Sequence, residues 1–175
     1  LDYDMATMIH SELRSKGLSL KLNADVTGFE EKDDGVSVLL HNDAPIKTDM
    51  VILAIGVAPD NTLAKDANME LGIKGAIVVN DKMETSIPDI YAVGDAVLVK
   101  HTITGKEAVI SLAGPANKQG RISADNICGR NSRYKGSMGT SVIKLFDLTA
   151  ASVGLTEKAA KDSGYDFESV ILSPS

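Results

Sequence analysis

Cysteine and clustered positive charge are scarce in this sequence. Of its 175 residues only Cys128 is a cysteine, which excludes an intramolecular disulfide and a two-cysteine redox centre within the chain. The net charge is −6 and no cluster of Lys and Arg stands out, so nucleic acid and anionic membranes are poor candidates as partners. A single unpaired cysteine fits a reducing, cytoplasmic setting best.

Long apolar runs and phosphate-binding loops are missing as well. The longest strongly apolar run, residues 50–55, is far short of the ~20 residues that cross a bilayer. No charged-then-apolar secretory leader is visible, and no GxGxxG motif occurs in the chain. The chain opens on Leu1 and directly on a helical pattern, so we expect it to be a piece of a longer protein.

The pattern of apolar residues predicts an α/β fold. Apolar residues make up 43% of the chain, enough for a real core in one ordinary domain or two small ones. Their spacing predicts helices over 3–16 and 115–128, the second opening on Pro115. Continuous apolar runs over 50–55 and 90–94 predict strands buried inside a parallel sheet.

The remaining expected elements are shorter. The alternating segment 26–31 suits a small antiparallel ribbon with one wet face. The polar, Gly-rich segment 131–140 is the best internal boundary, and 98–114 is expected to be loop-like. Further strands are expected over 18–23, 36–42, 48–56, 75–80, 141–146, 150–154 and 167–173, with helices over 62–69 and from Thr156 to Ser163.

The first candidate site residue is Asp95, in the stretch TSIPDIYAVGDA (85–96). It follows an expected apolar strand and Gly94, at the carboxyl end where open α/β sheets bind ligands. A carboxylate only accepts hydrogen bonds, so it suits hydroxyl donors such as a sugar or ribityl chain. An isolated Gly-Asp would indicate a helix cap or turn, but the preceding strand favours a ligand.

The second candidate is the start of the helix in LAGPANKQGRISADNI (112–127). Helix N-termini carry unpaired N–H groups and about half a positive charge. Pro115 has no N–H, so the expected free donors are Ala116 and Asn117. One face of this helix is small, allowing close approach of a flat ring or another backbone; the alternative is tight packing against the sheet. Its members are Ala113, Ala116, Gly120 and Ala124.

The third candidate is Gly56, which ends the apolar run 51–55 and permits close approach of a ligand. The alternative is a glycine that merely ends a strand. Other chemistry is not indicated. The three histidines lack ligand-like spacing, and Cys128 lies at a helix end without a partner cysteine. The histidines are His10, His41 and His101.

Four stretches in this order resemble the FAD-dependent pyridine nucleotide-disulfide oxidoreductases: VILAIGVAPDN, TSIPDIYAVGDA, LAGPANKQGR and GTSVIKLFDLTAASVG. The similarity covers essentially the whole chain and is closest to the branch with coenzyme A-disulfide reductases, NADH oxidases and persulfide reductases. The resemblance implies partial doubly wound (Rossmann-like) FAD- and NAD(P)-binding domains. Residues 1–58 would be the second half of the NAD(P)H domain, 59–138 the returning half of the FAD domain, and 139–175 the start of a dimerisation domain.

The resemblance also implies site roles. Asp95 would bind the flavin ribityl hydroxyls, beside Gly94 and Ala96. The helix start over Pro115, Ala116 and Asn117 would face the pyrimidine end of the isoalloxazine, and Gly56 would lie near the nicotinamide nucleotide.

Two departures from the family are clear. Its glycine-rich fingerprint and redox cysteine are not in this chain, and Cys128 matches no redox cysteine. Ala58 stands where many relatives carry an arginine, which puts cofactor details there in doubt.

Three interpretations stay open. The chain is part of a cytoplasmic FAD- and NAD(P)H-dependent reductase of a small-molecule disulfide, coenzyme A-disulfide or persulfide; or of an NADH oxidase or peroxidase that reduces oxygen or peroxide; or it is a cofactor-free domain that acts only through assembly. Because half of each nucleotide site is missing, we expect the isolated chain to bind no FAD, to lack reductase activity and to self-associate.

Overall fold

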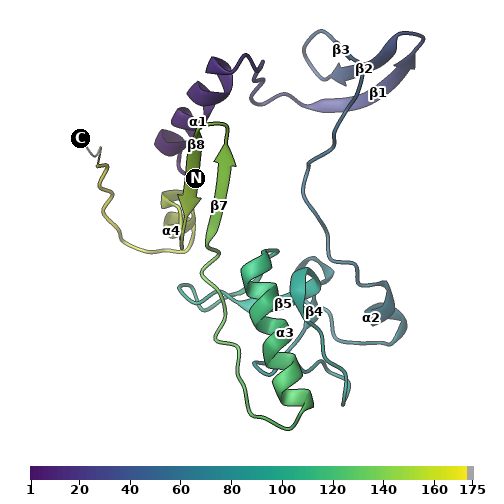
Figure 1. The fold of residues 1–175 in the computed structure, drawn as a ribbon, viewed down its shortest axis with the longest axis vertical. Coiled ribbons are helices and arrows are strands. Elements are labelled where there is room, and N and C mark those ends of the chain that lie inside the picture. Colours follow the sequence, from purple (N-terminus) through teal and green to yellow (C-terminus); the bar gives the residue numbers. More distant parts are fainter. Residues whose placement is uncertain (173–175) are drawn as a thin grey trace. The chain divides into compact units, whose positions relative to one another are not determined.

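The computed structural model describes residues 1–172 and divides the chain into two compact units (Figure 1). One unit is His10–Val57, and the other combines Leu1–Ile9 with the chain from Ala58 onward. Helix α1 (Tyr3–Ser15) contributes residues to both units and ends one residue before the end that the sequence predicts. No helix in the described part of the chain is long and apolar enough to cross a membrane.

The unit His10–Val57 contains a three-stranded antiparallel meander. Strands β1 (Val26–Lys32), β2 (Gly35–Leu40) and β3 (Ile46–Thr48) pair in the order β1-β2-β3. The turn into β2 requires glycine, because Gly35 has φ +131° and a Cβ there would lie 2.6 Å from the carbonyl oxygen of Thr48. The expected antiparallel ribbon is therefore confirmed.

The apolar run 50–55 is not a buried strand in the described chain. It is irregular and exposed: the side chain of Ile52 is 79% exposed and that of Ile55 is 91% exposed. The reason is backbone hydrogen bonding, because a central strand needs a neighbour on each side and no described segment pairs with this run. The expected strand over 18–23 is irregular for the same reason.

The second unit is built on a mixed sheet with strands β4 (Ile77–Val78), β5 (Val97–Lys100) and β6 (Glu107–Val109). The pair β4/β5 is parallel and the pair β5/β6 is antiparallel. Helix α3 (Ala113–Ile127) belongs to the same unit, and its Ile122 packs against the buried core cluster to which Val97 and Val99 of β5 belong. The short helix α2 (Thr62–Asp66) and the 3₁₀ turns η1 (Ile73–Gly75) and η2 (Gly94–Ala96) connect these elements.

The expected strand over 90–94 is shifted along the chain. Tyr91 makes a single bridge with Glu84, and the buried strand begins only at Val97. Segment 98–114, expected to be a loop, contains most of β5 and all of β6. The shift arises because β4 and β6 offer hydrogen-bond partners to 97–100, whereas no described strand flanks 90–94 on both sides.

The core of this unit consists of Met83, Val97, Val99 and Tyr134. Tyr134 belongs to the polar, Gly-rich segment 131–140, which packs back onto the sheet. Its backbone N–H donates to the carbonyl oxygen of Asp81 at 2.7 Å. Polar composition alone therefore does not make this segment a linker, since one aromatic side chain anchors it.

The last elements form a hairpin and a capped helix. Strands β7 (Ser141–Leu145) and β8 (Leu148–Ser152) are antiparallel, and helix α4 (Glu157–Asp162) follows. Thr156 caps α4 as predicted, since its Oγ1 accepts from the N–H of Ala159 at 3.1 Å. The expected strand over 167–173 is absent from 167–172, which pair with no strand, and Ser173 lies outside the described residues.

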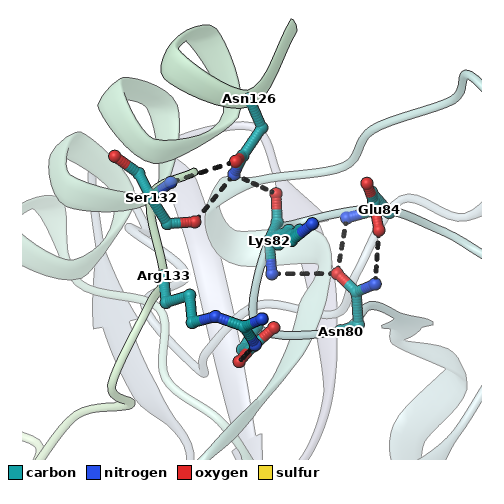
Figure 2. A network of polar contacts seen from close by, with 7 residues as sticks. Asn80, Lys82, Glu84, Asn126, Ser132 and Arg133 are labelled. Atoms are coloured by element: carbon teal, nitrogen blue, oxygen red, sulfur yellow. Dashed lines mark hydrogen bonds and ion pairs between the residues drawn. The ribbon is translucent and has the colours of Figure 1, made fainter. Parts of the chain in front are cut away.

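A polar network anchors the C-terminal end of α3 (Figure 2). The side-chain amide of Asn126 donates to the carbonyl oxygens of Lys82 at 3.1 Å and Ser132 at 2.9 Å, and its Oδ1 accepts from the N–H of Ser132 at 3.1 Å. Asn80 closes the turn that contains Lys82, because its Oδ1 accepts from the N–H groups of Lys82 and Glu84. The helix, the turn and the returning segment are thereby joined by one amide.

We predict that Asn126→Ala lowers the free energy of unfolding by about 2–3 kcal/mol, because three hydrogen bonds, each worth roughly 0.5–1.5 kcal/mol net, are lost together. Urea unfolding followed by circular dichroism measures this. The matched control is Asn131→Ala, at an exposed asparagine whose side chain makes no hydrogen bond within residues 1–172. Equal effects of the two substitutions would contradict the anchoring role.

Candidate functional site

Gly94, Asp95 and Ala96 form the 3₁₀ turn η2, immediately before β5. Asp95 therefore precedes a strand, whereas the sequence led us to place it after one. The change follows from the shift of the strand to Val97. Gly94 has φ +89°, and no atom lies within 4 Å of where a Cβ would stand, so the space beside this backbone is open.

Asp95 is exposed, and its side chain makes no hydrogen bond or ion pair within residues 1–172. A carboxylate without a cation partner is ready to accept hydrogen bonds from a ligand's hydroxyl groups.

Helix α3 begins at Ala113, two residues earlier than the sequence predicts. Pro115 is therefore its third residue. The N–H of Ala116 is not free, because it donates to the carbonyl oxygen of Leu112 at 3.1 Å. Asn117 lies inside the helical ladder, and its side-chain amide donates to the carbonyl oxygen of Ala113 at 3.2 Å.

The N–H groups without an intrahelical acceptor are consequently those of Ala113 and Gly114. They replace Ala116 and Asn117 as the expected donors. The positive end of the helix stays at the predicted place, at the start of α3.

One buried hydrogen bond connects the two predicted parts of the site. The backbone N–H of Gly94 donates to Oε1 of Gln119 at 2.7 Å, and Gln119 is 1% exposed. Gln119 lies one turn beyond Pro115, so η2 packs against the first half of α3. The sequence reasoning did not single out Gln119, because a polar side chain within a small-residue helix start carries no periodic signal.

The small residues of α3 differ in burial, because Ala116 and Gly120 are half-buried. Gln119 and Ser123 are buried, whereas Ala113 and Ala124 are exposed. At Gly114 and Gly120 a Cβ would meet nothing within 4 Å. Within residues 1–172, the predicted small face is therefore open at Ala113 and Ala124 and half-covered at Ala116 and Gly120.

A cavity of about 390 Å³ lies beside β4 and β5, and another of about 360 Å³ adjoins the start of α3. Gly114, Pro115 and Lys118 contribute one wall of the second cavity, and Tyr134 and Met138 belong to its opposite side. The Lys118 ammonium adds positive charge to that of the helix start. The arrangement suits a ligand with hydroxyl donors near Asp95 and an electron-rich or carbonyl-bearing group near α3.

Gly56 belongs to the unit His10–Val57, with φ +100° and open space where a Cβ would stand. Gly56 thus belongs to a different unit from η2 and α3. No group of three or more His, Cys, Asp or Glu within residues 1–172 is arranged to hold a metal ion. Cys128 is exposed at the C-terminal end of α3.

Comparison with known proteins gives consistent matches. Residues 1–120 match the family model described as pyridine nucleotide-disulphide oxidoreductase. Over 98% of its length, the chain is 36% identical to the CoA-dependent NAD(P)H sulfur oxidoreductase of Pyrococcus furiosus, of which it covers 38%. It is 33% identical, over 98% of its length, to an NADH oxidase of Enterococcus faecalis, of which it covers 39%.

Solved structures agree. The reduced CoADR-RHD of Bacillus anthracis superposes on the chain with a TM-score of 0.91 and 47% identity, over 96% of this chain and 30% of that one. The chain thus spans about two fifths of the length of the two curated relatives.

We predict that Gly120→Ala raises the free energy of unfolding by about 0.5–1 kcal/mol, because a mid-helix glycine costs that much relative to alanine and the new Cβ meets nothing. Gly136→Ala is the matched control. Gly136 has φ +91° and a Cβ there would clash with the carbonyl oxygen of Lys100, so we expect a loss of at least about 1 kcal/mol. Urea unfolding measures both, and destabilisation by Gly120→Ala would show that this face of α3 is already packed.

Proposed function

The chain belongs to the pyridine nucleotide-disulphide oxidoreductase family, and we propose from this premise that it forms the central part of a flavoprotein reductase. The family's enzymes depend on FAD and NAD(P)H. The proposed reaction passes hydride from NAD(P)H through FAD to a small-molecule disulfide, coenzyme A-disulfide or persulfide. Its setting in the proposal is the cytoplasm, where the lone Cys128 stays reduced.

The observation that carries this proposal is the hydrogen bond between Gly94 and Gln119. It joins η2, which carries Asp95, an acceptor without a partner in the described chain, to the first half of α3. A flavin has ribityl hydroxyls that donate and a pyrimidine ring that is rich in acceptors, so its two ends fit this pair. The residues present therefore fit part of an FAD site.

Each site residue has a proposed role. Asp95 accepts from the ribityl hydroxyls, and Gly94 and Ala96 line the approach of the ribityl chain. The start of α3 at Pro115, Ala116 and Asn117 faces the pyrimidine ring, with the backbone donors supplied by Ala113 and Gly114. When bound, FAD supplies the redox chemistry, and the positive helix start stabilises negative charge on the reduced ring. Gly56 is assigned to the nicotinamide nucleotide.

The domain assignment is part of the same proposal. Residues 1–58 are assigned to the NAD(P)H-binding domain, 59–138 to the FAD-binding domain and 139–175 to the start of a dimerisation domain. The division of the chain between Val57 and Ala58 supports the first boundary, whereas Leu1–Ile9 group with the unit from Ala58 onward. Reduction of sulfur is assigned to a cysteine outside this chain, because Cys128 is exposed at a helix end away from η2 and the start of α3.

A second candidate function ends the electron path on oxygen or peroxide. The similarity to an NADH oxidase of Enterococcus faecalis favours it. Both functions use the same FAD elements of this chain, so the choice of acceptor depends on residues elsewhere.

A third candidate, of another class, is a cofactor-free domain that acts through assembly. The exposed apolar segment 50–57 favours it.

We predict that Asp95→Ala, made in the longer protein, reduces bound FAD to less than about a tenth of the wild-type content at equal FAD concentration. The loss of several hydrogen bonds to hydroxyl groups, each worth about 0.5–1.5 kcal/mol net, gives this magnitude. Flavin absorbance relative to protein concentration measures it. The 175-residue chain alone is expected to bind no stoichiometric FAD, because the few hydrogen bonds it offers do not offset an association cost of roughly 4–15 kcal/mol.

The matched control is Asp66→Ala, at an exposed carboxylate in α2. Its flavin content should equal that of the wild type. Unchanged flavin in Asp95→Ala would refute the role of Asp95, and a flavin-free wild type would refute the flavoprotein proposal itself.

We also predict that the isolated chain self-associates through segment 50–57. Its side chains are exposed, at 70% for Met50 and 80% for Val57. Met50 bonds to the hydroxyl of Thr48, but no strand within residues 1–172 pairs with the segment, so a second chain gains both apolar burial and strand pairing. Light scattering after size exclusion at rising concentration should give a mass above that of a monomer. Ile55→Asp should restore the monomer, whereas Leu63→Asp, an equally exposed site in α2, should not.

A further inference from the structure

Gln119 is unusual among the buried residues of this chain. Together with Met83 and Val97 it is one of the largest fully buried side chains within residues 1–172, and it is the polar one of the three. Burying a side-chain amide without a hydrogen-bond partner costs on the order of several kcal/mol. Its Oε1 has one partner, the backbone N–H of Gly94. If this position served packing alone, an apolar residue of the same size would suffice.

The partner group lies at the start of η2, where a hydrogen-bond acceptor is needed. The N-cap residue of η2 is Val93, whose side chain has no oxygen and makes no capping hydrogen bond. Gln119 supplies that acceptor from another element, 25 residues along the chain. Because Asp95 directly follows Gly94, the same hydrogen bond fixes the backbone from which the Asp95 carboxylate projects.

We propose that Gln119 is a positioning residue of the flavin site: its Oε1 caps η2 and holds the Asp95 carboxylate in register with the first turn of α3. The inference rests on the proposed flavoprotein function and deepens it, since it couples the ribityl-binding carboxylate to the helix start that faces the ring. Gln119 itself contacts neither part of the flavin; it acts through Gly94.

The test compares three substitutions. Gln119→Met keeps the length and volume of the side chain and removes the acceptor. Gln119→Glu keeps an acceptor oxygen at the same position in either protonation state. Ser123→Ala is the control, because Ser123 is buried one turn further along the same face of α3 and makes no hydrogen bond to η2.

The first measurement is hydrogen exchange of the Gly94 amide in the 175-residue chain, which needs no flavin. We expect exchange to quicken about tenfold in Gln119→Met, the change that loss of one hydrogen bond of ordinary net strength produces. Gln119→Glu and Ser123→Ala should leave it within about threefold of the wild type. Unchanged exchange in Gln119→Met would overturn the proposed cap.

The second measurement is FAD affinity of the longer protein, with the unfolding midpoint recorded for each variant. We expect the dissociation constant to rise about tenfold or more in Gln119→Met, with rescue by Gln119→Glu, and to stay unchanged in Ser123→Ala. A rise that merely follows the loss of stability, without rescue by Glu, would overturn the positioning role.

The two proposals fail in different ways. A flavin-binding wild type whose Gln119→Met variant binds FAD equally well would overturn the inference alone. A wild type that binds no FAD would overturn the proposed function, and the role of Gln119 in flavin binding with it.

Discussion

The hydrogen bond from Gly94 to the buried amide of Gln119 holds together the two main elements of the proposed flavin site. It joins the turn with Asp95 to the middle of helix α3, and α3 is fixed a second time at its C-terminal end by Asn126. Between the two amides, Ile122 packs against the core residues of β5. A helix held near its middle by one amide and by apolar packing, and at its C-terminal end by a second amide, cannot rotate or slide without losing these contacts. Space for an added Cβ remains at Gly114 and Gly120 of α3 within residues 1–172.

Local signals predicted much of the fold, and non-local pairing decided the rest. The helices over 3–16 and 115–128 and the cap at Thr156 depend on side chains within a few residues of one another, and they were predicted nearly to the residue. The strands over 50–55 and 90–94 depend on partner strands, which a window of sequence does not reveal. Their apolar character indicated that these segments are suited to burial, but it did not identify the strands with which they pair.

For the candidate site too, local sequence signals indicated some of the residues, and contacts between distant residues determined the others. Asp95 and the start of α3 were identified from their residue types and local context, and the structure brings them together. Gln119 was missed because its partner lies 25 residues away and its burial is visible only in three dimensions. The shift of the free donors from Ala116 to Gly114 shows how far a helix boundary matters, since two residues change which N–H groups point outward.

The charges around α3 and η2 also constrain what the site binds. Asp95 and the start of α3 carry opposite charge, and Lys118 adds a cation near the helix start. If the carboxylate and the ammonium formed an ion pair, each would satisfy the other and little would be left for a ligand. No ion pair joins Asp95 and Lys118 within residues 1–172. A dianionic ligand would be attracted to the start of α3 but repelled by Asp95. A cation would be attracted to Asp95 but repelled by the start of α3. A neutral polyhydroxylated chain that ends in an acceptor-rich ring interacts favourably with both, which is the physical reason why a flavin suits this pair better than a simple anion or cation.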